Sequence, residues 1–145
     1  MVGRRVAGPL ATVVLDAGGV LAYIGPARAI RDYCHAVLAD GQQVVLPTIV
    51  YAQIERGLPP RSLGAHFLTE LLDICTLATL DLPIARQAGW LLRDSQTTDV
   101  VDAVVVAEAV ARGSATIVTS DRGDIDYLLG FTANRSRRGV RVVGP

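Results

Sequence analysis

The chain alternates between short apolar runs rich in β-branched residues and longer segments in which apolar residues recur every three or four positions. Runs of the first kind are typical of buried strands, and segments of the second kind are typical of amphipathic helices. The predicted strands are 13–15, 44–46, 74–77, 116–119 and 140–143. The predicted helices span roughly 26–39, 48–57, 61–72, 83–94, 100–112 and 124–129.

Strands that alternate with helices indicate a mainly parallel sheet whose two faces are covered by helices. The 145 residues correspond to one domain by length and are enough for a proper hydrophobic core. We therefore expect a single α/β domain over residues 1–145, a three-layer α/β/α sandwich around a mainly parallel sheet of four or five strands. Pro26, Pro47 and Pro83 fall at or just before predicted helix starts. The segment 134–139 is predicted as a polar loop.

Four carboxylates stand inside or directly after apolar segments, where a charged group is costly. Asp16 and Asp121 follow the first and fourth predicted strands, whereas Glu55 and Asp102 lie in predicted helices. Ligands of open parallel sheets bind beyond the carboxyl ends of the strands, so these side chains are expected to meet at one edge. Carboxylates that converge repel each other unless a cation lies between them, and hard oxygen ligands suit Mg²⁺ or Mn²⁺.

An acidic metal site is suited to the hydrolysis of phosphodiesters. This reaction needs a nucleophilic water, neutralisation of the phosphate and stabilisation of the leaving oxygen, and one or two Mg²⁺ ions supply all three. The sequence has no glycine-rich phosphate-binding loop, no nucleophile elbow, and no lysine for a Schiff base or a phosphate clamp. The acidic residues are therefore the strongest chemical signal in the chain.

Four segments resemble the PIN domain and, within it, the VapC toxins of bacterial toxin–antitoxin pairs. They are 13–17, 49–57, 101–103 and 117–124, and they contain the four carboxylates in order. The match covers nearly the whole chain, and the order and spacing of the segments, rather than any one of them, carry it. The resemblance implies a PIN-like fold for the expected α/β/α sandwich.

The resemblance also implies an activity, that of a Mg²⁺- or Mn²⁺-dependent endoribonuclease toxin. Such an enzyme hydrolyses RNA phosphodiesters with a metal-activated water held by the acidic cluster. Asp16 and Asp102 are then the chief metal ligands, and Glu55 and Asp121 complete the catalytic site.

The same resemblance implies a protein partner, the cognate antitoxin, which commonly carries a basic side chain into the acidic site. Tyr23, Ile24 and the helix 26–39 are expected to form part of its groove. A homodimer is a further alternative for the apolar helix faces.

An RNA substrate needs positive charge as well as metal. The net charge of zero argues against bulk, non-specific binding of nucleic acid but leaves room for a local basic patch. Arginine contacts to phosphates would make the affinity for RNA salt-dependent. The candidates are Arg4, Arg5, Arg122, Arg135, Arg137 and Arg138.

Several residues near the acidic segments also have structural interpretations. Asp99 and Asp124 are expected to open helices, where a negative charge favours the helix dipole, with a place in the site as the alternative. Glu55 is alternatively a helix-end acid paired with Arg56 or Arg93.

The residues that follow Asp16 depart from the pattern of PIN domains, which more often carry a small polar residue nearby. The segment 17–19 contains two glycines and is expected to form a loose turn. A hydroxyl group for the site then has to come from Thr48, Thr119 or Ser120.

The remaining chemically distinctive residues are expected to be structural. Trp90 is predicted to pack in the core, with a groove for a partner peptide as the alternative. Cys34 and Cys75 lack metal-ligand spacing and are predicted to be buried thiols in a reducing compartment. His35 and His66 have no obvious partners in the sequence.

Two other functions compete with the nuclease. Residues 14–21 look like the first motif of haloacid-dehalogenase-type phosphatases, with Asp16 as the nucleophile, but Gly18 replaces that motif's second acid. The missing lysine and the short chain also weigh against a phosphatase. The third alternative is a catalytically silent PIN-like binding module, which the four intact carboxylates make less favourable.

The location is expected to be the cytoplasm. Arg4 and Arg5 precede an apolar stretch, but Pro9 and Asp16 interrupt it, which argues against a signal peptide and against a membrane-spanning segment.

Overall fold

The structure, a computed structural model, describes residues 10–145, so Arg4 and Arg5 lie outside the described residues. Its strands form one five-stranded sheet in which every neighbouring pair is parallel, in the order β3-β2-β1-β4-β5. The strands are β1 (Thr12–Leu15), β2 (Val44–Pro47), β3 (Thr76–Ala78), β4 (Ala115–Val118) and β5 (Val140–Val143).

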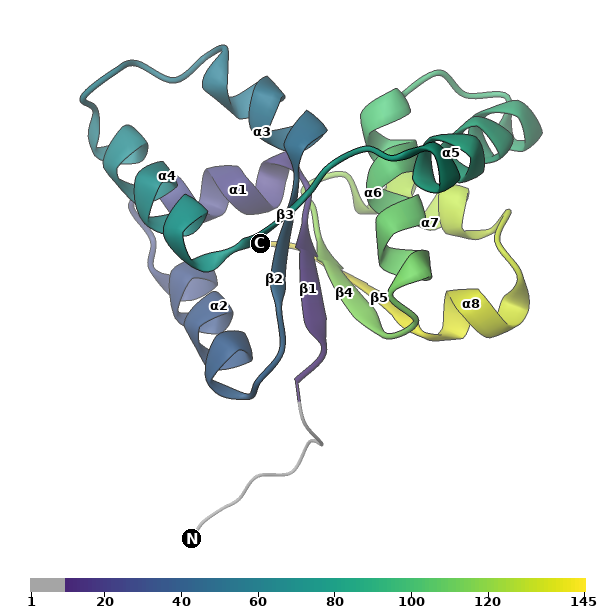
Figure 1. Ribbon diagram of the computed structural model, residues 1–145, viewed down its shortest axis with the longest axis horizontal. Coiled ribbons are helices and arrows are strands. Elements are labelled where there is room, and N and C mark those ends of the chain that lie inside the picture. Colours follow the sequence, from purple (N-terminus) through teal and green to yellow (C-terminus); the bar gives the residue numbers. More distant parts are fainter. Residues whose placement is uncertain (1–9) are drawn as a thin grey trace, which may run out of the picture.

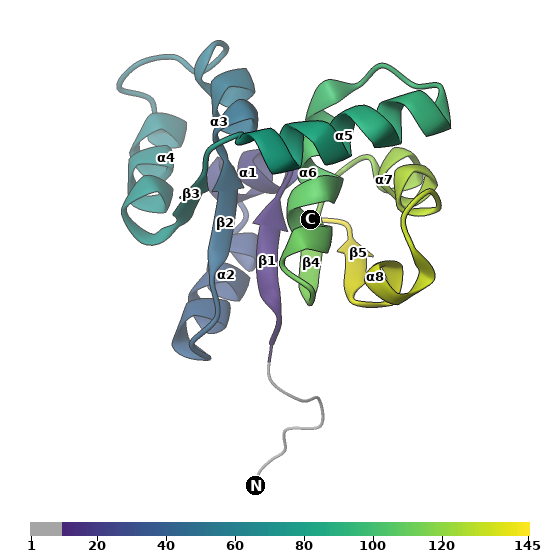
Figure 2. The ribbon, with the colours of Figure 1, turned by 45° about the vertical axis from the view of Figure 1, so that its right-hand side comes forward.

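Helices cover both faces of this sheet, with α1 to α4 on one side and α5 to α8 on the other (Figure 1 and, turned by 45°, Figure 2). They are α1 (Ala17–Ile24), α2 (Ala29–Ala39), α3 (Thr48–Glu55), α4 (Leu63–Ile74), α5 (Leu82–Ser95), α6 (Val100–Ala111), α7 (Arg122–Leu129) and α8 (Asn134–Arg138). The three-layer α/β/α sandwich is confirmed, and its sheet has five strands and is entirely parallel.

The three central strands carry the hydrophobic core. Every residue of β1, β2 and β4 is buried, and most of them are Val, Leu or Ile. This composition is typical of parallel strands, because helices cover both faces and leave no polar side of the sheet. α6 is buried along most of its length as well, from Asp102 to Ala109.

β1 is the strand at which the connections change direction. The chain moves from β1 to β2 and β3 on one side, and then returns to place β4 and β5 on the other. Leu15 pairs with Val118, and the N–H of Asp16 donates to the carbonyl oxygen of Val118 at 3.0 Å. The residues that follow β1 and β4 therefore lie side by side at the carboxyl edge, where sheets of this kind bind their ligands.

Two helices differ from the sequence-based expectation. The predicted turn over 17–19 is the start of α1, and the predicted polar loop over 134–139 contains the short helix α8. Glycine pairs are unfavourable in helices, and a five-residue polar helix has no apolar periodicity, so neither element has a local signal. β3 also begins two residues later than predicted, at Thr76.

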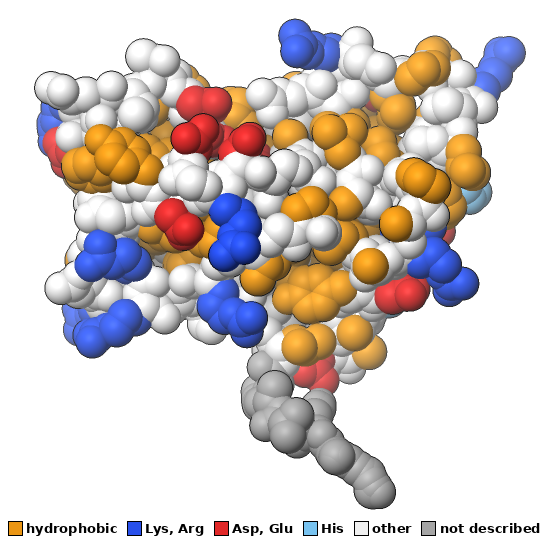
Figure 3. Space-filling model, turned by 180° about the vertical axis from the view of Figure 1, so that it is seen from behind, with side chains coloured by type: hydrophobic (Ala, Val, Ile, Leu, Met, Phe, Trp, Pro, Cys, Tyr) orange, Lys and Arg blue, Asp and Glu red, His pale blue; other side chains and the backbone are white. Residues whose placement is uncertain are grey.

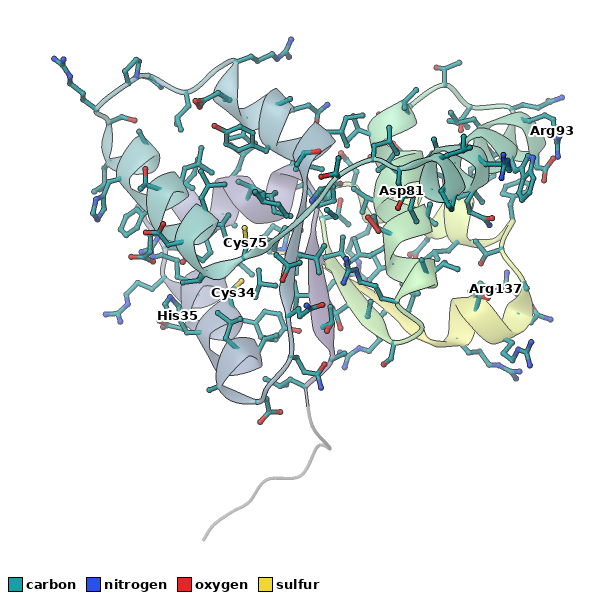
Figure 4. All side chains as sticks on the ribbon, viewed as in Figure 1. Cys34, His35, Cys75, Asp81, Arg93 and Arg137 are labelled. Atoms are coloured by element: carbon teal, nitrogen blue, oxygen red, sulfur yellow. The ribbon has the colours of Figure 1, made fainter. Side chains whose placement is uncertain are left out.

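Some side chains outside the acidic segments also differ from expectation. Trp90 is 47% exposed, so the prediction that it packs in the core is wrong. His35 does have partners, since its Nε2 lies 3.7 Å from Glu70 Oε1 and 3.5 Å from the Tyr23 hydroxyl. Cys34 is buried and Cys75 half-buried, and both thiols are free (Figure 4). Within residues 10–145, no helix has the length and apolar character needed to cross a membrane.

Candidate functional site

Asp16 and Thr119 form the fixed centre of the carboxyl edge. The Thr119 hydroxyl donates a hydrogen bond of 2.6 Å to Asp16 Oδ2, and Asp16 is only 3% exposed. The same Thr119 oxygen accepts a hydrogen bond of 2.9 Å from the N–H of Asp121. Of the three hydroxyls expected near Asp16, Thr119 is therefore the one that contacts it, and it also links Asp16 to Asp121.

The two glycines after Asp16 permit a close approach of α1 to the end of β4. A Cβ atom on Gly18 would lie 2.1 Å from Ser120 Oγ and 2.6 Å from Ser120 N, and one on Gly19 would lie 2.8 Å from the carbonyl oxygen of Val118. No side chain fits at such distances, so only glycine allows this packing. The glycines do not loosen a turn, as the sequence suggested; they hold Asp16 against the residues that follow β4.

Asp16 and Asp121 both occupy the N-cap position of a helix, yet neither side chain caps that helix. Aspartate is a preferred N-cap residue because its carboxylate can accept a hydrogen bond from a free backbone N–H. Asp99 does so in this chain, accepting from the N–H of Asp102 at 3.0 Å. The carboxylates of Asp16 and Asp121 are thus left for other interactions.

Asp102 is the most strongly perturbed acid of the carboxyl edge. It lies in the first turn of α6 and is only 7% exposed. Burial, followed by the negative charges of Asp99, Asp16, Asp121 and Asp124, raises the pKa of Asp102 to about 7. Among the described residues, its carboxylate has no hydrogen bond and no ion pair to offset that charge. The charges of Asp16 and Asp121 thus act on Asp102 at the same edge of the sheet.

Asp102 opens into a cavity of about 330 Å³ between the start of α6 and α7. The cavity is lined by Thr97, Thr98, Asp99, Asp102, Asp124, Tyr127 and Leu128. Asp124 therefore belongs to the site region as well as to the first turn of α7. Asp99 caps α6, as predicted, and also lines the cavity.

Glu55 is the predicted site residue for which no contact with the other carboxylates is found. It is exposed at the end of α3, beside the hydroxyl of Tyr51, whose pKa is raised by burial and by this neighbouring carboxylate. In the described part of the chain, Glu55 forms no ion pair with Arg56 or Arg93, and Arg93 pairs instead with Asp94 at 3.1 Å. A cavity of about 320 Å³ runs from Ala17, next to Asp16, to the residues that flank Glu55.

The donor set at the carboxyl edge fits a hard divalent cation. Every ligating group there is a carboxylate or hydroxyl oxygen, and Mg²⁺ and Mn²⁺ prefer such ligands. The carboxylate of Asp102 has no cationic partner among residues 10–145, and a cation at this edge would offset its negative charge together with those of the neighbouring acids. In the same residues, no three His, Cys, Asp or Glu side chains are already arranged to hold a metal ion.

Arginines lie on the same side of the molecule as the cavity. Arg122 opens α7, and Arg135, Arg137 and Arg138 belong to α8. Figure 3 shows acidic side chains gathered near the top of the face opposite to that of Figure 1, with a hydrophobic patch beside them and basic side chains below. Positive charge is thus available near the acidic edge without being part of it.

Sequence reasoning missed the aromatic wall of the cavity. Tyr127 lies in a predicted helix that contains several charged residues, a pattern typical of a solvated surface. Its position beside Asp102 depends on how α7 packs against α5 and α6, and no local motif encodes that packing.

No family model matches the sequence, and no curated protein does so. Solved structures do match. The chain is similar to a chain in the crystal structure of VapBC2 from Rickettsia felis bound to a DNA fragment from their promoter, with a TM-score of 0.66 and 14% identity, covering 92% of this chain and 98% of that one. It is similar to a chain of DNA-bound VapBC from Salmonella typhimurium, with a TM-score of 0.63 and 15% identity over 93% and 98% of the two chains.

A third similar structure is FitAcB from Neisseria gonorrhoeae, with a TM-score of 0.59 and 18% identity over 90% of this chain and 95% of that one. Similarity at these identities shows a shared fold. The fold is the PIN-like α/β/α sandwich. The resemblance to the PIN domain found in the sequence is therefore confirmed for the fold.

Proposed function

We propose that this protein is a Mg²⁺- or Mn²⁺-dependent endoribonuclease that acts as the toxin of a toxin–antitoxin pair. The observation that carries the proposal is the buried carboxylate of Asp102, which faces a cavity and is surrounded by four other carboxylates. Carboxylates that gather without a cationic partner repel each other, and a divalent cation bound among them would relieve that repulsion. The fold shared with chains of the VapBC and FitAcB structures supports the assignment to a toxin–antitoxin pair.

Asp16 and Asp102 would hold the metal ion. Such an ion would neutralise the charge of a bound phosphate and would make a water molecule more acidic near neutral pH. Thr119 fixes the Asp16 carboxylate through its hydrogen bond and leaves the second carboxylate oxygen available. Asp121 and Glu55 would complete the site by holding a second ion, a water of the metal ion, or both.

The RNA would be held by phosphate contacts with arginines of α7 and α8. Arg122, Arg135 and Arg138 are exposed, and Arg137 is half-buried. Such contacts position a strand without reading its sequence, so the choice of target depends on the shape of the RNA and on contacts with its unpaired bases.

The antitoxin would bind near the start of α2 and send a basic side chain toward Asp102. Tyr23 is fully buried and Ile24 nearly so, which means that they support this surface from below and do not line it. An apolar hollow does lie beside them, lined by residues of α1, of the α1–α2 connection and of the C-terminus: Leu21, Ala22, Gly25, Pro26, Ala27, Ala29, Ile30 and Pro145. A homodimer would use other apolar side chains, of which Leu77, Leu80 and Leu82 are exposed around β3 and the start of α5.

The test of the proposal is RNA cleavage by purified protein, free of antitoxin, in Mg²⁺ or Mn²⁺, with EDTA and Asp102→Asn as controls. Total tRNA and rRNA are suitable substrates because they include structured loops. We expect cuts that leave 5′-phosphate and 3′-hydroxyl ends and that disappear in EDTA and in the variant. Release of phosphate from a small phosphoester, without cuts in RNA, would support the phosphatase instead. Folded protein with neither activity would support a silent binding module.

A further inference from the structure

The cavity at Asp102 has an aromatic wall that the acidic chemistry does not use. Tyr127 lines the cavity and is 53% exposed. Its ring packs edge to face against Phe131, with a centroid distance of 5.2 Å and an angle of 73° between the ring planes. Phe131 is itself 40% exposed. Large aromatic side chains bury much apolar area when they pack, so an exposed pair beside a polar cavity is a costly arrangement for stability alone.

The Tyr127 ring is held in place. Its hydroxyl donates a hydrogen bond of 3.3 Å to the carbonyl oxygen of Ser95, at the end of α5. Ser95 is buried, and its own hydroxyl lies 2.7 Å from that of Thr97, another residue of the cavity wall. A ring held by its hydroxyl and by packing against Phe131 loses little conformational freedom when a ligand stacks on it.

A source of positive charge adjoins the aromatic pair. Arg137 of α8, labelled in Figure 4, donates a hydrogen bond of 3.3 Å to the carbonyl oxygen of Gly130, the residue before Phe131. Arg135 and Arg138 on the same short helix are exposed. Acidic cavity, aromatic pair and basic helix thus follow one another along α7 and α8.

We infer that the ring of Tyr127, supported by Phe131, is a stacking site for one unpaired nucleobase of the RNA, next to the phosphate that is cut. This inference rests on the proposed nuclease function. Proteins that bind single-stranded RNA stack its bases on aromatic side chains and hold its backbone with basic ones. Stacking accepts any base, and the hydroxyls of Thr97 and Thr98 in the same cavity offer hydrogen bonds to a base edge.

The competing explanation is that Tyr127 only packs α7 against α5. If Tyr127 stacks on a base, replacing it should weaken cleavage only of substrates that contain that base. If Tyr127 only packs α7 against α5, replacing it should weaken cleavage of every substrate equally. A matched pair of RNAs, with and without that base, therefore separates the two explanations.

The experiment measures steady-state cleavage, in Mg²⁺, of a single-stranded decaribonucleotide that spans a cut mapped in tRNA or rRNA. Each nucleotide around the cut is replaced in turn by an abasic one. We expect Tyr127→Leu to raise KM about 5- to 150-fold with little change in kcat, because a stacking contact made equally in the ground and transition states affects binding only. Tyr127→Phe keeps the ring and should stay close to the wild type. Trp90→Leu removes an exposed aromatic outside the cavity and should have no effect.

The decisive result concerns the abasic substrate that lacks the stacked base. The wild type should show a KM for this substrate raised by about the same factor as Tyr127→Leu shows for the intact substrate. On this abasic substrate, Tyr127→Leu and the wild type should then have the same KM. If Tyr127→Leu does not fold, the abasic substrates still test the inference with the wild-type protein alone. Without stacking, no abasic position should raise the KM of the wild type. An equal effect of Tyr127→Leu on every substrate, or none at all, in protein that still cuts RNA would overturn the stacking site and leave the nuclease intact. A wild type that cuts no RNA would overturn both.

Discussion

The Thr119 hydroxyl and the Asp16 carboxylate, 103 residues apart in the chain, are joined by a buried hydrogen bond of 2.6 Å at the carboxyl edge of adjacent strands β1 and β4. Hydroxyl-to-carboxylate bonds of this length are among the stronger ones in proteins, since the acceptor is charged. The bond fixes the side chain expected to hold the metal ion before any ion arrives. It is the kind of supporting contact that orients a ligand and tunes its affinity for metal.

Replacing Thr119 by Val removes this bond while keeping the shape of the side chain. We expect the affinity for Mn²⁺ to fall about 10- to 100-fold, because the Asp16 carboxylate loses its orientation. The free energy of unfolding should fall by only ~1 kcal/mol, mostly from the N–H of Asp121 that loses its acceptor. Mn²⁺ binding, followed by electron paramagnetic resonance, measures the first effect and urea unfolding the second.

Ser120→Ala is the matched control for Thr119→Val. Ser120 is an exposed neighbouring hydroxyl for which no hydrogen bond to Asp16 is found in the described residues. Its loss should leave the affinity for Mn²⁺ unchanged. Equal affinities of Thr119→Val and wild type would show that the hydrogen bond does not prepare the site.

A methyl group at Gly18 should disrupt the site through its backbone. The new Cβ would lie within 2.6 Å of the backbone nitrogen of Ser120, so α1 or the end of β4 has to shift. We expect Gly18→Ala to lower the free energy of unfolding by ~1–3 kcal/mol, the range seen for overpacked interiors, and to abolish cleavage. Thermal unfolding and the RNA assay measure the two effects.

Gly89→Ala provides the comparison, because nothing lies within 4 Å of a Cβ at that position in α5. This variant should be more stable than the wild type by ~0.5–1 kcal/mol, since alanine favours the helix. If Gly18→Ala behaves in the same way as Gly89→Ala, the close approach of α1 to β4 is not required.

The sequence predicts most of this architecture and three members of the acidic edge, and the reasons are physical. Buried parallel strands are continuous apolar runs, and a carboxylate that directly follows such a run has to lie at the carboxyl edge of the sheet. Asp16 and Asp121 are located by this argument. Asp102 is located by its apolar neighbours in α6. The missed helix α1 contains a glycine pair in its first turn, and the close approach of these glycines to Ser120 and Val118 becomes visible only in three dimensions.

The wall of the cavity could not be predicted in the same way. Tyr127 and Thr97 meet because the end of α5 and the middle of α7 pack together, and pairwise packing of helices leaves no signature in either segment. The hydroxyl of Thr119 was one of three candidates, and the register of β1 against β4 decides between them. Local pattern thus identifies the charged groups, while tertiary contacts identify the groups that position them.

The arginines of α8 should contribute to RNA affinity through charge alone. Replacing Arg135 and Arg138 by Gln should weaken RNA binding to a similar extent for all sequences, and should reduce the slope of log K against log salt by ~0.7 for each phosphate that an arginine no longer neutralises. Filter binding at several salt concentrations measures the slope. Arg28→Gln is the control, because Arg28 is exposed on the α1–α2 side and pairs with Asp32. An unchanged slope in the double variant would place the RNA elsewhere.

A basic fragment of the cognate antitoxin should compete with Mg²⁺ for the acidic edge. An arginine that reaches Asp102 supplies the positive charge that the metal ion would otherwise supply, so the two cannot bind together at full strength. We expect the apparent Kd for Mg²⁺, measured by calorimetry, to rise with the concentration of the fragment. The same fragment with its arginine replaced by alanine should lose this effect. An unchanged Kd for Mg²⁺ in the presence of the arginine fragment would refute the competition.

The stability of the metal-free protein should fall as the pH rises through neutrality, and Asp102 should be the cause. Its pKa is raised to about 7 in the folded chain, against about 3.9 in an unfolded one. The folded state therefore favours the protonated acid, so this contribution to stability is fully present below about pH 4 and is lost as the pH approaches 7. Asp102→Asn cannot ionise. In EDTA at pH 8 it should be more stable than the wild type by ~1–3 kcal/mol, whereas at pH 4 the two should be similar.

Urea unfolding in EDTA at pH 4 and pH 8 measures the difference in the free energy of unfolding between the variant and the wild type. The contributions of the other carboxylates cancel in this difference because both proteins contain them. Saturating Mg²⁺ should then stabilise the wild type at pH 8 by mass action and leave Asp102→Asn nearly unchanged. Asp73→Asn, an exposed acid at the end of α4, is the control and should alter neither quantity. A variant at Asp102 that is less stable than the wild type at pH 8 without metal would mean that the folded chain already compensates this charge, and the argument for a cation at the carboxyl edge would lose its main support.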